Sequence, residues 1–370
     1  MTMISLIARA AIAVSVVSAA AVNSPRAEID CTGVNAVNIN CKSSEAPYRR
    51  DHFYVGGRSL NATTGTLTVD QLYVEKLTPI GDSHKPNPLV FIHGGGIVRG
   101  YVVYLVDSNS IGRSSESDLA SFNMVAGTSN ENVESGFTAV ELYDYYPQAA
   151  LHTQWPGSGQ NGDPVFYNFK ESFIPLNSNY AAQETAMRRS GCELLSLLGA
   201  KAYIISHSLG SRFPILMSND CPQYIAASID IEAASVPFWS YAYGLGGSPS
   251  TPYGFTWTAV DYVLAITNSS ELEIESVGEE SLAKRNCYRQ KKPARHLPNI
   301  TSVPYLMVTS EASVHITYDH CVVDYLKQVG GSPDFIKLAD IGIHGNSHFM
   351  HVEKNNLEIA VVVQDWIETH

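Results

Sequence analysis

The chain has 370 residues, of which 45% are hydrophobic and 16% charged, and its formal net charge is −12. This length and composition suit one large domain, or two modest ones, with an ample core. The acidic balance, with no basic run, excludes nucleic acid as an expected partner.

The first 27 residues differ in character from the rest of the chain. Arg9 is the one positive side chain before an apolar stretch over 10–22, and small residues over 19–27 offer cleavage sites. This pattern predicts a secretory signal peptide over about 1–27, with the mature domain at 28–370. An N-terminal membrane anchor is the alternative, but the stretch is too short to span a bilayer and no other stretch is long enough. We therefore expect a secreted, extracellular protein without a membrane span.

The cysteines and the glycosylation sequons also indicate whether the chain is secreted. Six cysteines stand at Cys31, Cys41, Cys192, Cys221, Cys287 and Cys321. An even number in an exported chain favours disulfide bonds, although the pairing of six is largely undetermined by sequence. Cys31 with Cys41 is the expected local bridge at the mature N-terminus. Asn61, Asn268 and Asn299 head Asn-x-Ser/Thr triplets and are candidate glycosylation sites.

Apolar runs and helical spacing predict an alternating series of elements. In chain order, strands are expected at 53–56, 66–77, 89–92, 101–106, 203–205, 225–231, 303–308 and 335–341. Helices are expected near 136–143, over 179–198 with Gly199 as the stop, and at 361–367. Because strands alternate with helical segments, we predict an α/β fold with a mostly parallel sheet flanked by helices.

The interval 237–298 interrupts this alternation after the sixth predicted strand. It is rich in glycine, proline, tyrosine and tryptophan. An insertion at the end of a strand would cover a site at that edge of the sheet, so we interpret it as a cap that shapes an apolar pocket. The alternative is a surface excursion packed for its own stability.

The most informative segment reads AYIISHSLGS and contains Ser208. A buried strand there runs directly into a turn of small residues and then into a predicted helix. A serine on such a turn is the nucleophile elbow, written G-x-S-x-G, in which the first glycine is here replaced by Ser206. The elbow exposes the hydroxyl at the carboxyl end of the sheet, beside a helix N-terminus that favours negative charge.

A serine nucleophile needs a base within hydrogen-bond reach and a carboxylate that orients the base. The segment GIHGNSHFMH follows the last predicted strand, and its loop returns to the edge where the elbow lies. Among its three histidines we choose His348 as the base and interpret His344 as a loop residue. A zinc site of His344 and His348 is the alternative, but no H-E-x-x-H pattern is present, so we expect no metal.

Two carboxylates compete for the orienting role. Glu232 ends the strand at 225–231, and Glu311 follows the strand at 303–308. Both stand at the carboxyl end of a strand, and position alone does not separate them.

Backbone donors for an oxyanion are expected from two segments. The sequence HGGG at 93–96 follows a buried strand and matches the motif that supplies one N–H group, which we assign to Gly95. The second donor is expected from Leu209, the residue after the nucleophile.

Taken together, these motifs resemble the α/β-hydrolase superfamily, whose chain order is serine, acid, histidine. The sequences LVFIHGGG, TQWPGSG, IISHSLGS, VTSEASVHITYDHC and HGNSHFMHVEKNN further resemble a subgroup of secreted bacterial and fungal esterases. In that subgroup S-H-S carries the nucleophile, G-N-S-H the base, and a glutamate after the sixth strand is the acid. The resemblance thus implies Ser208, His348 and Glu232. Some subgroup members carry cysteines where this chain has glycines at 94–96, so no redox property is transferred.

The sequence therefore predicts a secreted serine esterase that cleaves a carboxylic ester or a lactone through an acyl-enzyme and needs no cofactor. Two alternatives stay open. One is an acyltransferase or lyase on the same triad in metabolite processing, and the other is a non-catalytic binding protein with this fold.

Overall fold

The computed structural model describes residues 31, 41, 47–62, 65–81, 84–92, 101–109, 112–114, 124–125, 128–173 and 176–370. The predicted signal peptide at 1–27 and the glycine tract at 94–96 lie outside the described residues.

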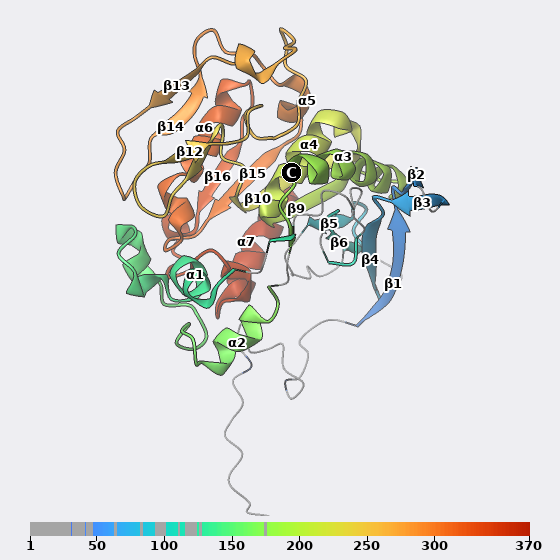
Figure 1. The fold of residues 1–370 in the computed structure, drawn as a ribbon. Coiled ribbons are helices and arrows are strands. Elements are labelled where there is room, and N and C mark those ends of the chain that lie inside the picture. The colour runs from blue at the N-terminus through green and yellow to red at the C-terminus, as the bar shows by residue number, and fades with distance from the viewer. Residues whose placement is uncertain are drawn as a thin grey trace, which may run out of the picture.

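An eight-stranded sheet forms the centre of the described structure, in the order β1-β4-β6-β5-β9-β10-β15-β16 (Figure 1). Its strands are β1 (Tyr48–Val55), β4 (Leu72–Pro79), β5 (Leu89–Ile92), β6 (Val103–Asp107), β9 (Ala202–Ser208), β10 (Ile225–Ala233), β15 (Tyr305–Thr309) and β16 (Asp334–Lys337). The first two pairings, β1 with β4 and β4 with β6, are antiparallel, and all others are parallel. The predicted mostly parallel α/β sheet is confirmed.

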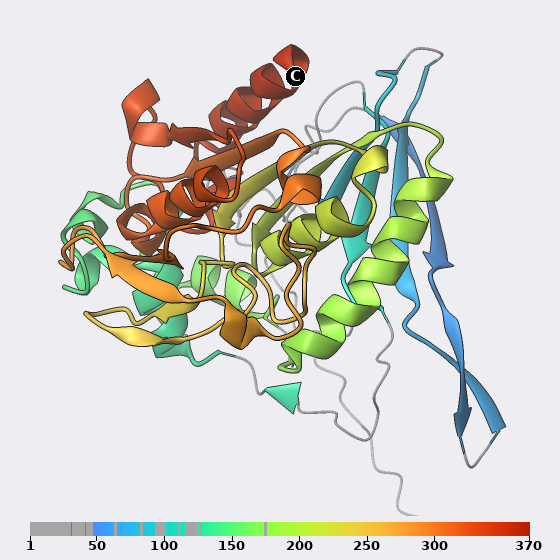
Figure 2. The same cartoon turned by 90° about the horizontal axis from the view of Figure 1, so that it is seen from above.

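The central strands are buried on both faces, which explains their unbroken apolar sequences. Val90 and Ile204 face a core shared with α3 (Tyr180–Leu197), α4 (Arg212–Asp220) and α6 (Asp319–Gln328). Leu89 and Tyr203 face a second core that is closed by α7 (Asn356–Thr369). The sheet therefore lies between two helical layers, with α7 on one side and α3 and α4 on the other (Figure 2).

Local chemistry sets where the longest helix begins and ends. The side chain of Asn179 accepts a hydrogen bond from the Ala182 N–H group and caps the first turn of α3. Gly199 follows the last turn at φ 75°, a left-handed conformation that favours glycine, as the sequence predicts.

Three predicted elements differ from the structure. The strand expected at 66–77 is divided into β3 (Gly65–Val69) and β4, because Asp70 turns the chain at φ 64°. The strand expected at 335–341 is β16 followed by a 3-10 turn, η9 (Leu338–Ile341). The helix expected near 136–143 is a π turn, η2 (Glu134–Thr138), followed by a 3-10 turn, η3 (Val140–Leu142).

The interval 237–298 contains little regular structure. Its two hairpins pair β11 (Trp239–Tyr241) with β12 (Gly247–Pro249), and β13 (Ile274–Val277) with β14 (Cys287–Gln290). Backbone N–H groups of Trp257 and Thr258 donate to the buried Glu184 carboxylate of α3. The remaining short strands and α-helices are β2 (Arg58–Ala62), β7 (Met124–Val125), β8 (Leu176–Asn177), α1 (Asn130–Val133), α2 (Pro164–Lys170) and α5 (Pro298–Thr301).

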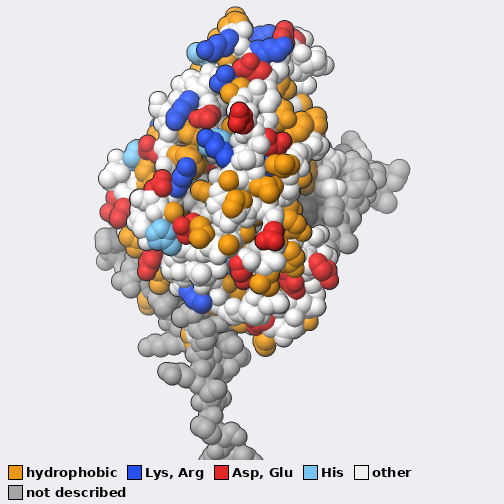
Figure 3. Space-filling view, turned by 90° about the vertical axis from the view of Figure 1, so that its left-hand side faces the viewer, with side chains coloured by type: hydrophobic (Ala, Val, Ile, Leu, Met, Phe, Trp, Pro, Cys, Tyr) orange, Lys and Arg blue, Asp and Glu red, His pale blue; other side chains and the backbone are white. Residues whose placement is uncertain are grey.

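All six cysteines are paired. The bridges are Cys31–Cys41, as expected from sequence, Cys192–Cys221, which joins α3 to the end of α4, and Cys287–Cys321, which joins β14 to α6. The last bridge therefore fastens the interval 237–298 to the helical layer. Acidic and basic side chains are interspersed on the face shown in Figure 3. No helix within the described residues has the length and apolar character needed to cross a membrane.

Candidate active site

Ser208 is the last residue of β9 and adopts φ 53°, ψ −123°, a conformation that non-glycine residues rarely take. The 3-10 turn η5 (Leu209–Ser211) and then α4 begin directly after it. The hydroxyl therefore stands at the carboxyl edge of the sheet, where the free N–H groups of a helical start are close by. Strain of this kind, about 1–3 kcal/mol per residue, is typical of functional turns.

Two neighbours show why the elbow tolerates its unusual sequence. A Cβ on Gly210 would lie 2.7 Å from the backbone oxygen of Ile92, so the second glycine of the motif is required by close approach. Ser206 stands where the first glycine is expected. Its hydroxyl donates to the buried carboxylate of Asp230, which faces it in the parallel register with β10. This polar partner accounts for a serine at that position.

His348 lies between Ser208 and Glu232. Its Nε2 atom is 2.9 Å from Ser208 Oγ, and its Nδ1 atom is 2.6 Å from Glu232 Oε2. Since a carboxylate can only accept, Nδ1 carries the hydrogen, and Nε2 is left to accept the serine proton. The structure thus brings together three residues that are far apart in the chain.

A bulge in β10 aims Glu232 at the histidine. The register with β9 shifts between Ile231 and Ala233, and Glu232 itself adopts φ 50°. A bulge places an extra residue out of the normal alternation and redirects its side chain. Glu232 Oε1 accepts hydrogen bonds from the Ser310 N–H and hydroxyl groups, and Oε2 accepts one from Ser313 Oγ.

Glu311, the alternative acid, lies elsewhere. Its carboxylate is 3.1 Å from His344 Nδ1 and accepts a hydrogen bond from the Gly345 N–H group. It therefore holds the start of the loop that carries His348, and its contacts do not include the His348 ring. His344 is correspondingly a loop residue, as the sequence suggests.

Glu353 orders the rest of that loop, and sequence reasoning missed it. Its buried carboxylate accepts hydrogen bonds from the Asn346 side-chain amide and from the Ser347 N–H group. It also lies 2.8 Å from His152 Nε2. Burial lowers the pKa of His152, but hydrogen bonds to Glu141 and Glu353 raise it to about 9, so an ion pair supports the loop. No local pattern marks Glu353 or His152, because their partners are distant in sequence.

Two further histidines pack against His348 and were also missed. His207, the middle residue of S-H-S, donates from Nε2 to the His348 carbonyl oxygen at 2.9 Å. On another side, the His315 ring is stacked on that of His348, with centroids 4.7 Å apart. His315 Nδ1 lies 2.9 Å from Asp319 Oδ1, so a second histidine–carboxylate pair stands beside the first.

The environment suits a neutral base beside an ionised acid. Burial raises the pKa of Glu232, but the His348 hydrogen bond and nearby imidazoles outweigh it and lower that pKa to about 2. Burial lowers the pKa of His348, and the Glu232 carboxylate offsets this only in part. Burial also lowers the pKa of His315, but Asp319 outweighs it and raises that pKa. These shifts favour the neutral form of His348 and the charged form of His315.

Within the described ranges, one group of side chains near the elbow could hold a metal ion: Glu232, His315 and His348, whose ligand atoms lie within 4.8 Å of one another. Each of these side chains already has a hydrogen-bond partner: Glu232 and His348 bind each other, and His315 binds Asp319. The geometry therefore matches proton transfer better than coordination. His344, the other histidine of the zinc alternative, faces Glu311 instead.

Of the two expected oxyanion donors, Leu209 belongs to the described residues and Gly95 does not. Leu209 follows Ser208 at the first position of η5, where its N–H group belongs to the start of a helical segment. Gly95 lies outside the described residues. However, β5, which precedes the glycine tract, is the direct neighbour of β9, so the tract follows a strand that ends beside Ser208.

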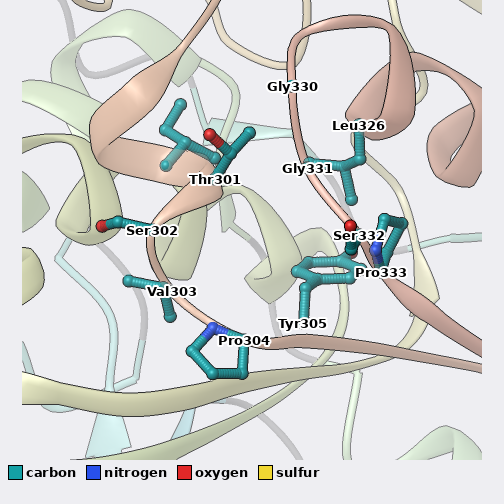
Figure 4. A pocket seen from close by; sticks show the side chains of 11 residues that line it. Thr301, Ser302, Val303, Pro304, Tyr305, Leu326, Gly330, Gly331, Ser332 and Pro333 are labelled. Atoms are coloured by element: carbon teal, nitrogen blue, oxygen red, sulfur yellow. The ribbon is translucent and has the colours of Figure 1, made fainter.

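A pocket of about 240 Å³ adjoins the elbow. Its lining includes Leu209, Ala234, which donates its N–H group to the Ser208 carbonyl oxygen, and His315. Residues of the interval 237–298, Trp239 and Trp257 among them, also line it. A separate pocket of about 290 Å³, shown in Figure 4, lies around Tyr305 and Pro333 at the amino ends of β15 and β16. In a parallel sheet that is the opposite edge from Ser208, so the Figure 4 pocket is not part of this site.

Comparison with known proteins identifies relatives of the chain. No family model matches the chain. Over 360 residues it is 34% identical to a probable secreted lipase, phiG, of a fungal species (strain ATCC 74256), covering 89% of this chain and 94% of that protein. The chain belongs to the α/β-hydrolase superfamily. Within it, the chain groups with esterases and lipases and is a carboxylic ester hydrolase.

Solved structures show the same fold. A novel bacterial esterase, 20% identical, aligns with a TM-score of 0.51 over 89% of this chain and 98% of that chain. Naproxen esterase from Bacillus subtilis, 13% identical, aligns over 87% and 93% of the two chains with a TM-score of 0.40, which is too low to support an argument.

Proposed function

We propose that this α/β-hydrolase cleaves carboxylic esters, lactones among them, with Ser208 as nucleophile, His348 as base and Glu232 as orienting acid. The observation that carries the proposal is the 2.9 Å contact between His348 Nε2 and Ser208 Oγ, with Glu232 on the other ring nitrogen. The secreted lipase phiG, whose name records action on lipid esters, supports the substrate class.

The reaction follows from the hydrogen bonds. Ser208 Oγ attacks the ester carbonyl while His348 Nε2 takes its proton, and Glu232 stabilises the imidazolium. The N–H groups of Leu209 and Gly95 would hold the oxyanion. His348 then gives the proton to the departing alcohol, which leaves an acyl-enzyme. A water molecule, deprotonated by the same nitrogen, attacks the acyl group and restores Ser208.

We further propose that 1–27 is removed as a signal peptide and that 237–298 acts as a cap. Disulfide bonds and the name of the secreted relative support export.

Of the proposed glycosylation sites, Asn61 and Asn268 are exposed, whereas the Asn299 amide donates to the Asn219 carbonyl oxygen at 3.0 Å. N-terminal sequencing and glycopeptide mapping of the secreted protein test these assignments.

A fluorophosphonate probe tests the nucleophile directly. We expect one adduct per chain, which mass mapping places on the peptide containing Ser208, because this hydroxyl alone faces a neutral imidazole at the elbow. Denatured protein is the matched control and should not react. An adduct confined to another serine, or none on native protein, would reject the proposal.

The acid limb of the pH profile should report on His348. Only the neutral imidazole can accept the serine proton, and burial lowers its pKa, so kcat/KM should persist below pH 6.5 before falling. Replacing His315 by glutamine removes a neighbouring positive charge that also lowers this pKa, so the midpoint should move upward. Profiles of kcat/KM with a neutral ester measure both. A wild-type midpoint above 6.5 would contradict this description.

A further inference from the structure

The pocket beside the elbow contains an arginine that stands apart from the others in the described ranges. Arg212 belongs to the first turn of α4, four positions after the nucleophile, and lines the same pocket as Leu209 and Ala234. The residue is 95% buried, since its relative exposed area is 5%. A long charged side chain in such a place needs partners to offset the loss of water.

The partners of Arg212 are incomplete. Nη2 donates to Gln183 Oε1 at 2.8 Å, and Nε has no hydrogen-bond partner within the described part of the chain. The guanidinium carbon lies 4.3 Å from the Tyr180 ring centroid, a cation–π contact that offsets only part of the cost of burial. Burial lowers the pKa of Arg212 and the Glu184 carboxylate raises it, but a guanidinium stays protonated in either case.

Every other arginine in the described part of the chain has a carboxylate partner, which Arg212 lacks. Each of them has a carboxylate within ion-pair distance; the pairs are those of Arg49, Arg50, Arg58, Arg113, Arg188, Arg189, Arg285, Arg289 and Arg295. Arg285 is the closest comparison, since its side chain is equally buried. It binds Glu280 and the carbonyl oxygens of Ala242 and Gly244. Arg212 alone among these lacks a carboxylate partner, and it faces a pocket.

Glu184 does not fill that role, because its oxygens are used elsewhere. It accepts hydrogen bonds from the Trp257 and Thr258 N–H groups and from Thr258 Oγ1. These contacts fasten the interval 237–298 to α3. The Glu184 carboxylate thus balances part of the charge without an ion pair, while the buried Nε–H group of Arg212 is left without a partner in the described part of the chain.

The rest of the lining combines aromatic rings with small polar and aliphatic side chains. Trp239 and Tyr241 of β11, Trp257, and Tyr318 beside α6 surround the space. Flat rings accept an apolar or unsaturated chain, and a guanidinium presents parallel N–H donors that match a carboxylate. Leu209, which follows the reacting serine in the chain, lines the same pocket.

From this arrangement we propose that the pocket binds the arm of an ester substrate that ends in a carboxylate, with Arg212 pairing with that group. The inference rests on the proposed hydrolase function and narrows its substrate class to esters of this acidic kind. Because Leu209 and Arg212 line the same pocket, the arm would enter it beside the elbow and its carboxylate would meet the guanidinium. Trp239 and Trp257 also belong to the lining and offer rings against which the arm would pack.

Matched esters test the inference. The first pair is mono-4-nitrophenyl adipate and its methyl ester, in which only the former has a carboxylate on the acyl arm. The second pair is 4-(acetoxymethyl)benzoate and its methyl ester, in which only the former has a carboxylate on the alcohol arm. In one of these pairs, wild-type kcat/KM should favour the carboxylate by roughly 10- to 100-fold, the value of a hydrogen bond to a charged group. Arg212→Met should abolish the preference, and Arg212→Lys should retain part of it. Arg289→Met is the control for loss of one arginine, because Arg289 pairs with Glu275 outside this pocket.

The outcomes separate the two proposals. Cleavage of neutral esters with no preference for the acid in either pair, or a preference that survives Arg212→Met, overturns the carboxylate pocket and leaves the hydrolase intact. Cleavage of neither kind of ester overturns the hydrolase and the pocket with it. If Arg212→Met does not fold, competitive inhibition of the wild type decides: benzoate should inhibit neutral-ester cleavage more strongly than benzamide, and equal inhibition rejects the proposal.

Discussion

Replacing Ser208 by alanine should lower kcat on the order of 10⁶-fold, the loss found when a triad nucleophile is removed. The Oγ atom that attacks the carbonyl is lost, and His348 Nε2 is left without its 2.9 Å partner. The fold should survive, because alanine has the same Cβ as serine and takes φ 53° at similar cost. Steady-state kinetics with a chromogenic ester measures the effect, and thermal unfolding measures stability.

Ser211→Ala is the matched control for Ser208→Ala. Ser211 lies in the same turn and is buried, but its Oγ atom has no hydrogen-bond partner in the described part of the chain. Its replacement should change kcat by less than about tenfold. Turnover by Ser208→Ala at more than a hundredth of the wild-type rate would show that another group performs the attack.

Glu232→Gln should cause the second-largest loss, at least several hundredfold and towards the order of 10⁴-fold in kcat. An amide cannot offer the charge that stabilises the His348 imidazolium, and it permits the wrong ring tautomer. The remaining oxygen can still accept the hydrogen bonds from the Ser310 N–H and hydroxyl groups, so the side chain should keep its place. Single-turnover kinetics separates the chemical step from product release.

Glu311→Gln is the comparison that the sequence itself suggests. Its carboxylate binds His344 and the Gly345 N–H group rather than the His348 ring. The variant should lose far less activity than Glu232→Gln, because it loosens only the start of the loop. A larger loss for Glu311→Gln would transfer the acid role to that residue.

Much of the site could be predicted from local sequence. A buried strand followed by a serine between small residues identifies Ser208, because an elbow needs that order of a strand, a tight turn and a helix. A polar loop with glycine after the last strand identifies the region of His348 for a similar reason. Strand boundaries were less certain, since Asp70 breaks one predicted strand by a turn that its sequence does not reveal.

The acid could not be decided from the residues alone. Glu232 and Glu311 each end a neighbouring strand, and alternation does not separate them. The bulge between Ile231 and Ala233 decides it by turning the Glu232 side chain towards His348. A bulge depends on the register with β9, which is a property of two distant segments.

The order of the central strands, the parallel sheet and the turn that carries Ser208 were determined by the sequence itself, because periodic burial and turn chemistry act over a few neighbouring residues. The tertiary structure alone decided which carboxylate meets His348 and that His315 is stacked on its ring. It also decided that Arg212 faces the pocket without a carboxylate partner in the described part of the chain. Each of these depends on contacts between residues far apart in the chain, where packing and desolvation fix both orientation and charge.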